Sequence, residues 1–159
     1  APDARLIVDA NESWNDLDIA AEAALLAQYS VELIEQPVSA GKEHLLSGVR
    51  SPVPLCADES CHTSADVERL APYYDVINIK LDKAGGLTEA IAMAHAAQAM
   101  GLKIMVGCML STSLGIRPAF ALAQLAHWVD LDGPLLLAKD RADAFQFEFG
   151  RILPGDRLD

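Results

Sequence analysis

The sequence predicts an α/β protein whose parallel sheet forms part of a (β/α)8-type barrel. Short apolar strands alternate with helical segments along the 159 residues, without the turn signals of antiparallel hairpins between them. A charged residue closes each of four successive strands, at intervals of 26, 23 and 22 residues: Asp9, Glu35, Asp58 and Lys80. Units of this length need a crossover, which makes the strands parallel. We count about six units, whereas a complete barrel has eight in about 250 residues.

The composition is that of a folded protein with an acidic surface. Hydrophobic residues make up 52% of the chain, and the formal net charge is −11. This charge argues against nucleic acid or an anionic membrane as the partner, because both attract basic surfaces. No apolar run approaches the roughly 20 residues of a membrane-spanning helix, and no signal-peptide pattern is visible. The odd number of cysteines, without metal-ligand spacing, indicates a reduced, cytoplasmic protein: Cys56, Cys61 and Cys108.

Three strands are expected in the first half of the chain, each an apolar run that a charged or turn-forming residue ends: 5–9, 31–35 and 53–57. Apolar residues recur every three or four positions over 14–29, which predicts an amphipathic helix. A looser helical segment spans 42–49. The next helix is expected to run to about Leu70, with Thr63 or Ser64 as its N-cap.

Three further strands are expected in the second half of the chain: 76–80, 103–106 and 128–131. The stretch 87–100 carries an apolar stripe and ends at Gly101, which is typical of a helix. Another helix is expected over 116–126, with Pro118 in its first turn. A β-pair is expected around 145–149, near the end of the chain.

Three carboxylates, Asp9, Glu35 and Asp58, close three consecutive strands, so a parallel sheet brings them to one edge. Like charges this close repel and raise one another's pKa unless a cation lies between them. Oxygen ligands favour a hard divalent ion, most simply Mg²⁺. Because neither His nor Cys closes these strands, zinc is disfavoured. The alternative is that each acid only caps the helix that follows it.

Lys80 ends the strand 76–80 and is the candidate catalytic residue. In a partly desolvated site beside a metal-bound substrate, its pKa is expected to be low enough for it to act as a general base. The alternative is a structural ion pair with Asp58 or Asp82. Asp82 and Lys83 follow the strand, and we interpret them as loop and helix-entry residues.

Four motifs, in order along the chain, resemble those of the muconate-lactonizing subgroup of the enolase superfamily: Val8, Asp9, Ala10, Asn11; Ile34, Glu35, Gln36, Pro37; Ala57, Asp58, Glu59, Ser60; and Lys80 followed by Lys83, Gly85 and Gly86. The resemblance implies a (β/α)7β barrel behind an α+β capping domain. It also implies Mg²⁺ held by Asp9, Glu35 and Asp58. Lys80 would then exchange a proton on the carbon next to a carboxylate, through a metal-stabilised enediolate.

Two further stretches resemble dipeptide epimerases of the L-Ala-D/L-Glu type within this subgroup: 107–113 and 130–134. The resemblance implies that Asp130 and Asp132 hold the α-ammonium group of a dipeptide. It implies that Cys108, Met109 and Ser111 line the substrate site. Carboxylates suit a cationic amino terminus. The alternative for the two aspartates is a turn motif.

The chain departs from this subgroup in two respects. The second catalytic lysine, expected on a Lys-x-Lys strand, and the capping domain have no counterpart, because the chain starts where the third barrel strand would begin. We therefore expect residues 1–159 to be the C-terminal portion of a longer enzyme, inactive alone. Two open sheet edges lead us to expect association with the missing N-terminal segment or with another copy.

Two alternatives to dipeptide epimerisation remain open. One is another reaction of the subgroup, N-acylamino acid racemisation or o-succinylbenzoate synthesis, which keeps the metal site but binds no amino terminus. The other is a catalytically silent α/β domain whose strand-end acids serve structure or assembly.

Overall fold

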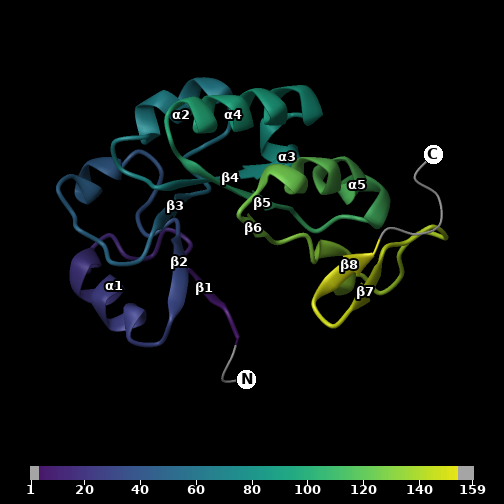
Figure 1. Ribbon diagram of the computed structural model, residues 1–159, viewed down its shortest axis with the longest axis horizontal. Coiled ribbons are helices and arrows are strands. Elements are labelled where there is room, and N and C mark those ends of the chain that lie inside the picture. The colour runs from purple at the N-terminus through teal and green to yellow at the C-terminus, as the bar shows by residue number, and fades with distance from the viewer. Residues whose placement is uncertain (1–3, 154–159) are drawn as a thin grey trace.

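Six parallel strands form one sheet that curls into a half-barrel, with helices on its outer side (Figure 1). The computed structural model describes residues 4–153. The strands follow the order of the chain, and every neighbouring pair is parallel. This confirms the predicted fold class. The strands are β1 (Leu6–Asp9), β2 (Val31–Glu35), β3 (Leu55–Ala57), β4 (Val76–Lys80), β5 (Lys103–Gly107) and β6 (Trp128–Val129).

Helices carry the chain from the end of most strands to the start of the next, as parallel pairing requires. The α-helices are α1 (Ile19–Ala27), α2 (Ser64–Leu70), α3 (Leu81–Ala84), α4 (Leu87–Ala99) and α5 (Ser113–Leu122). Short 3-10 turns are η1 (Glu43–Leu46), η2 (Ala123–Leu125) and η3 (Gly133–Leu136). An antiparallel hairpin, β7 (Gln146–Glu148) and β8 (Arg151–Leu153), confirms the expected β-pair.

Successive side chains of each strand point alternately to the outer and the inner side of the sheet, and each side contributes to a buried layer. Outward-facing residues such as Ile77 and Ile104 belong to the main core, together with Met93 and Ala97 of α4. Inward-facing residues form a second, small cluster: Leu33, Cys56, Val76 and Met105. Because side chains two positions apart share a face of a strand, the residues that follow these toward the strand ends also face inward. These are Glu35 on β2 and Asn78 and Lys80 on β4.

The first helix is shorter than its apolar pattern suggests. α1 begins at Ile19, because the Asp18 side chain accepts hydrogen bonds from the amides of Ala20 and Ala21, at 3.1 Å each, and so caps the helix there. The segment expected to be loosely helical at 42–49 contains only the 3-10 turn η1.

The expectation that Pro118 lies in the first turn of its helix is wrong. α5 begins at Ser113, which makes Pro118 the sixth helical residue. Pro118 has no N–H to offer the carbonyl group of Leu114, one turn earlier. The helix starts early because Ser113 is anchored there: its N–H lies 3.1 Å from each carboxylate oxygen of Asp140, and its hydroxyl group donates to the same carboxylate. Asp140 lies 27 residues after Ser113, so the local sequence around the helix does not reveal this anchor.

The outermost strands β1 and β6 each have one strand neighbour, so both edges of the sheet are open. In Figure 1 they bound the open side of the curled sheet. Apolar side chains at these edges are exposed: Leu6 by 42%, Ile7 by 40% and Val129 by 47%. Among the helices described for residues 4–153, none is long and apolar enough to cross a membrane.

Candidate active site

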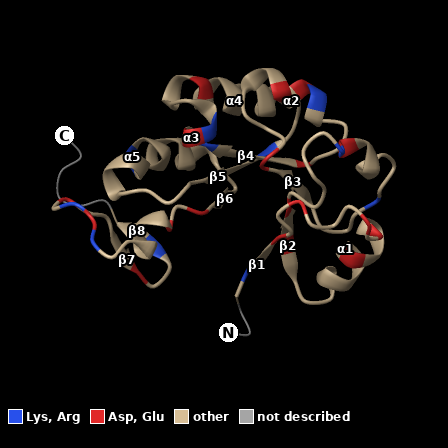
Figure 2. Cartoon of the chain, turned by 180° about the vertical axis from the view of Figure 1, so that it is seen from behind, with Lys and Arg blue, Asp and Glu red and all other residues tan. Residues whose placement is uncertain are grey.

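The charged ends of the strands meet on the inner side of the sheet. Asp9 pairs in register with Glu35. A cavity of about 380 Å³ is lined by both acids and by Asn78, Lys80 and Asp130. In Figure 2, acidic and basic segments lie close together near β3, β4 and α3. The structure therefore brings together candidates that the sequence distributes over about 120 residues, from Asp9 to Asp130.

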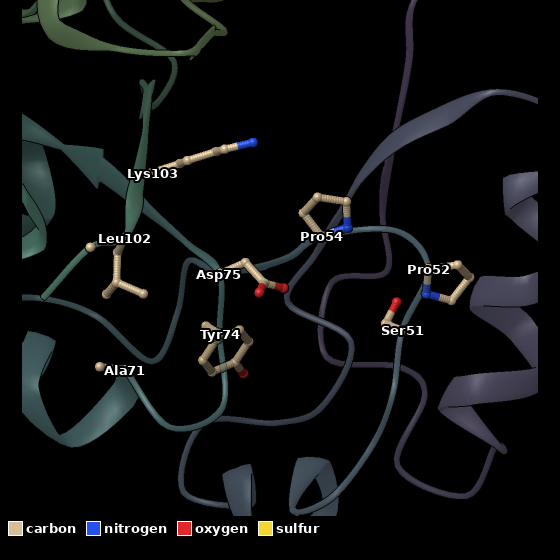
Figure 3. A pocket seen from close by; sticks show the side chains of 9 residues that line it. Ser51, Pro52, Pro54, Ala71, Tyr74, Asp75, Leu102 and Lys103 are labelled. Carbon is tan, nitrogen blue, oxygen red and sulfur yellow. The ribbon is translucent and has the colours of Figure 1, made fainter.

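A second cavity of about 380 Å³ lies at the opposite end of the strands (Figure 3). Its lining includes Pro54, Asp75 and Lys103, which stand where β3, β4 and β5 begin. The Asp75 carboxylate is already engaged, because it accepts the N–H of Leu55 at 2.9 Å. In parallel barrels the carboxyl ends of the strands carry the chemistry and the other end serves stability. The first cavity is therefore the candidate site.

Glu35 is buried on the inner face and accepts a hydrogen bond from Asn78 Nδ2 at 2.6 Å. Burial raises the pKa of Glu35 to about 7; the bond from Asn78 opposes this shift, and the carboxylates of Asp58 and Asp9 add to it. The contribution of Asp58 and Asp9 is the repulsion expected of acids at neighbouring strand ends. Within the described residues, the other amide atom, Asn78 Oδ1, is buried without a hydrogen-bond partner.

Asp58 is held between two lysines. Its carboxylate, 3% exposed, accepts from Lys80 Nζ at 2.5 Å through Oδ2 and from Lys83 Nζ through Oδ1. Burial by itself would raise the pKa of Asp58, but the ammonium groups outweigh it and hold this pKa below its usual value. The main-chain N–H of Asp58 donates to Gln36 Oε1 at 2.7 Å, which fixes the loop after β3.

The lowered pKa predicted for Lys80 beside a metal-bound substrate stays a prediction, and in the side-chain arrangement of this structure the pKa of Lys80 is not lowered. Burial does act to lower the pKa of Lys80, but the hydrogen bond and charge of Asp58 outweigh it, and the pKa is raised. The ion pair with Asp58, which was the alternative interpretation, is present. Lys80 is therefore protonated here, and it can accept a proton only after Asp58 has another cation to balance it.

The acids at these strand ends offer the type of ligand that a hard divalent cation prefers. They supply oxygen ligands only. The pKa of Glu35 is raised mainly by burial, and the repulsion from Asp58 and Asp9 that adds to this shift is what a cation would relieve. As the side chains lie, no group of three or more His, Cys, Asp or Glu residues in the described part of the chain is arranged to hold a metal ion. Asp58 contributes to this, because Lys80 and Lys83 occupy its two oxygens.

Asp130 and Asp132 follow β6 at the same end of the sheet. The surrounding protein, and then the neighbouring Asp132 carboxylate, raise the pKa of Asp130. Asp132 is the N-cap residue of η3, but its side chain makes no capping hydrogen bond. A repelling pair of acids favours a cation, such as an ammonium group, between them.

The loop after β5 lies against the loop after β6. A Cβ atom on Gly133 would sit 2.6 Å from the main-chain oxygen of Met109 and 3.2 Å from the sulfur of Cys108. Cys108 is half-buried, and burial raises its pKa, whereas Met109 is 51% exposed and Ser111 is half-buried. These residues border the loop that carries Asp132. Their contact with a substrate stays a prediction.

Three residues of the site were given no part in its chemistry from the sequence: Asn78; Gln36, which stands in one of the four motifs; and Lys83, which was interpreted as a loop or helix-entry residue. Asn78 could have been noticed as an amide inside an apolar strand, and Lys83 as a second lysine one helical turn after Lys80. Gln36 is fully buried, and its amide binds the N–H of Asp58 together with main-chain and hydroxyl groups nearby. Its place in the sequence gives no such signal.

Comparison with known proteins identifies the family. The enolase C-terminal domain-like family matches residues 1–157. The chain belongs to this family. An N-acetyl-D-glutamate racemase from Pseudoalteromonas is 51% identical, over 97% of this chain and 49% of that protein. An L-Ala-D/L-Glu epimerase from Escherichia coli is 49% identical, over 95% of this chain and 47% of that protein. These relatives confirm the resemblance that the strand-end motifs indicate.

Solved structures of the same superfamily share the fold. An enolase family member from Agrobacterium tumefaciens with homology to dipeptide epimerases, solved with sodium and L-Ala-L-Glu, has a TM-score of 0.93 and 52% identity, over 98% of this chain and 48% of that one. A dipeptide epimerase from Methylococcus capsulatus, solved with a magnesium ion, has a TM-score of 0.88 and 33% identity, over 97% and 47%. The chain spans about half the length of the curated relatives it matches.

Proposed function

We propose that the complete protein epimerises a dipeptide of the L-Ala-D/L-Glu type at the α-carbon next to the carboxylate, with Mg²⁺ as its cofactor. The observation that carries the proposal is the meeting of three strand-end acids with Lys80 on the inner side of one sheet. The epimerase from Escherichia coli, 49% identical, supports it. Residues 1–159 form the C-terminal portion of the enzyme in this proposal.

Asp9, Glu35 and Asp58 are the proposed ligands of Mg²⁺. Bound there, the ion would stabilise the negative charge that develops on the substrate carboxylate as the α-proton leaves. Asn78 holds the Glu35 carboxylate from β4 through the 2.6 Å hydrogen bond. Since the acids stand at the ends of strands or directly after them, the sheet fixes their positions before a substrate arrives.

Lys80 is the proposed catalytic acid and base on one face of the substrate carbon. As a neutral amine its Nζ takes the α-proton from one epimer, and as an ammonium group it protonates that same face when the reaction starts from the other epimer. Inversion also needs an acid and base on the opposite face, the second lysine expected in the N-terminal segment. Because the ion pair with Asp58 keeps Lys80 protonated, separation of this pair must come before proton abstraction.

Asp130 and Asp132 are the proposed anchors of the substrate's α-ammonium group. The raised pKa of Asp130 reflects burial and repulsion that an ammonium ion would relieve. Cys108, Met109 and Ser111 are the proposed substrate contacts from the adjoining loop. The substrate is thus a small molecule with a cationic end and an anionic end, and the site matches each end with the opposite charge.

The role of Lys80 is tested by replacing it with Met in the complete protein and following exchange of the substrate α-proton in D₂O. Exchange into one of the two epimers, L-Ala-L-Glu or L-Ala-D-Glu, should fall by about 100- to 10,000-fold, because the base on that face is lost. Asp82→Asn is the control, since Asp82 is exposed and lies two residues away; it should keep the wild-type rate. Undiminished exchange into both epimers in Lys80→Met would remove Lys80 from the chemistry.

Racemisation of an N-acylamino acid is the second candidate, because the N-acetyl-D-glutamate racemase is as similar as the epimerase, at 51% identity. An acylated nitrogen carries no charge, so such a substrate needs no ammonium anchor. In the variant with Asp130→Asn and Asp132→Asn, turnover of L-Ala-L-Glu should fall about tenfold or more, from loss of charge-assisted bonds. Turnover of N-acetyl-L-glutamate should be kept. A wild-type enzyme that turns over only the latter would favour the racemase.

We also propose that the chain works with a further segment of about its own size, in the cytoplasm. This chain covers 49% and 47% of two relatives, and both edges of its sheet are open. The cysteines Cys56, Cys61 and Cys108 are free thiols. Free thiols are usual in a reducing compartment, which supports the cytoplasmic assignment.

A further inference from the structure

Two lysines reach the same carboxylate from one strand and the helix that follows it. Lys80 is the last residue of β4 and the N-cap of α3, and Lys83 lies in the single turn of that helix. Gly85, with a φ of 78°, ends the turn in the left-handed region that glycine favours. This tight return places both ammonium groups at Asp58, with 16% of the Lys80 side chain and 13% of the Lys83 side chain exposed.

The bonding of the two ammonium groups differs. Lys83 Nζ donates to Asp58 Oδ1, to the main-chain oxygen of Asp58 at 2.5 Å and to the main-chain oxygen of Asn78 at 3.3 Å. An ammonium group has three N–H donors, so those of Lys83 are all used. Among the described residues, Lys80 Nζ has one hydrogen bond, to Asp58 Oδ2.

Lys83 therefore connects main-chain atoms of two elements, whereas Lys80 binds a side chain alone. The Asp58 carbonyl belongs to the loop after β3, and the Asn78 carbonyl belongs to β4. If Lys80 moves, Asp58 keeps one cation and its position. If Lys83 is removed, the buried Asp58 carboxylate depends on Lys80 alone, and releasing Lys80 would leave a buried charge unpaired, which is costly.

We propose that Lys83 is a positioning residue that fixes the Asp58 carboxylate, so that Oδ2 is available to Mg²⁺ and Lys80 is free to exchange protons. The inference rests on the proposed function, because it concerns the same Mg²⁺ site. It assigns different tasks to two lysines that are three residues apart: Lys83 stays in place, and Lys80 moves.

The test compares Lys83→Met with Lys80→Met in the complete protein, because each variant removes one positive charge beside Asp58. For Mg²⁺, the comparison is made where Lys80 no longer occupies Asp58 Oδ2. Mg²⁺ titrated by calorimetry should bind Lys80→Met about tenfold more tightly than the double variant with Lys80→Met and Lys83→Met, as expected for loss of a residue that orients a ligand. The double variant has one positive charge fewer, so charge alone would produce the opposite order.

A second measurement needs no metal. The amides of Asp58, Ser60 and Cys61 are hydrogen-bonded in the loop that Lys83 holds. Their hydrogen exchange should be about tenfold faster in Lys83→Met, from loss of bonds to a charged group. In Lys80→Met it should stay near the wild-type rate. If Lys83→Met does not fold, as circular dichroism would show, Lys83→Gln and Lys80→Gln replace the pair.

The outcomes separate this proposal from the proposed function. Faster exchange only in Lys83→Met, with weaker Mg²⁺ binding in the double variant than in Lys80→Met, supports positioning. Equal exchange in the two single variants overturns it. Equal Mg²⁺ affinity of Lys80→Met and the double variant, with unequal exchange, also overturns it, because Lys83 would then be merely structural. If neither the wild-type protein nor any variant binds Mg²⁺, but amide hydrogen exchange is faster only in Lys83→Met, the fixing of Asp58 by Lys83 is supported and the proposed magnesium chemistry is not.

Discussion

Gly107 shows how closely the interior of the half-barrel is filled at the site. It pairs in register with Lys80 across β4 and β5. A Cβ atom there would lie 2.8 Å from Asn78 Oδ1, closer than real Cβ contacts come, and 3.0 Å from Lys80 Cε, tighter than most such contacts. The missing side chain of Gly107 is thus what allows the amide that holds Glu35 and the candidate base to lie next to each other.

Gly107→Ala should therefore impair catalysis more than folding. The new methyl group must displace Asn78 or Lys80, and a displacement of about 1 Å can cost about 100-fold in rate. Exchange of the substrate α-proton measures the effect. Val106→Ala is the matched control, since Val106 is the neighbouring residue and belongs to the main core outside the sheet; it should lower thermal stability and keep the rate. A wild-type rate in Gly107→Ala would show that these side chains can shift freely.

At the scale of elements, α2 illustrates how local sequence fixes a helix boundary. Its N-cap is Thr63, one of the two residues predicted for that position, and Asp66 completes a capping box. The Asp66 carboxylate accepts the N–H groups of Thr63 and His62 at 2.9 and 3.1 Å and the hydroxyl group of Thr63 at 3.0 Å. Burial acts to raise the pKa of Asp66, but these bonds outweigh it and lower the pKa.

The free energy of unfolding should depend on Asp66 in a pH-dependent way. Asp66→Asn should lower it by about 1 kcal/mol at neutral pH, as loss of a cap does. Because the pKa of Asp66 is lower in the folded than in the unfolded state, its contribution is complete above about pH 4 and is lost as the pH falls through the folded value.

Urea unfolding at neutral pH and at about pH 3 measures this difference, which should shrink in acid. Glu68→Gln, on the exposed side of the same helix, is the control and should change stability little at either pH. A deficit for Asp66→Asn that is the same at both pH values would contradict the assigned role of the carboxylate.

At the scale of the whole molecule, the open edges of the sheet decide what the chain does alone. β1 and β6 leave main-chain donors and acceptors unpaired on one side, and their apolar side chains are exposed. Such edges pair with other strands. The 159-residue chain by itself should therefore form assemblies larger than its 17.0 kDa monomer in sedimentation velocity, with a mass that rises with concentration.

Positively charged side chains placed on the two edge strands should prevent this self-association. The double variant Ile7→Lys and Val129→Lys should be mainly monomeric, because lysine on an edge strand opposes pairing. Leu25→Lys changes an equally exposed leucine on α1, 48% exposed, and should associate like the parent chain. A parent chain that is monomeric at every concentration would refute this role for the edges.

The strand positions could be predicted from the sequence because they depend on short-range pattern. Each of the six parallel strands coincides with an expected apolar run, although β1, β3 and β6 are shorter than expected. Helix boundaries were less accurate where a distant partner decides them. Ser113 binds Asp140, 27 residues away, and this moved the start of α5 and with it the place of Pro118.

The sequence by itself determined that Asp9, Glu35, Asp58 and Lys80 share one end of a parallel sheet, because a repeating strand and crossover allows no other arrangement. Only the tertiary structure decided how these groups are paired. Lys80 and Lys83 both bind Asp58, Asn78 binds Glu35, and the hydrogen bond and charge of Asp58 raise the pKa of Lys80 against the effect of burial. The physical reason is that charge interactions depend on distances of a few ångströms between residues 22 to 43 positions apart, which a one-dimensional pattern does not contain.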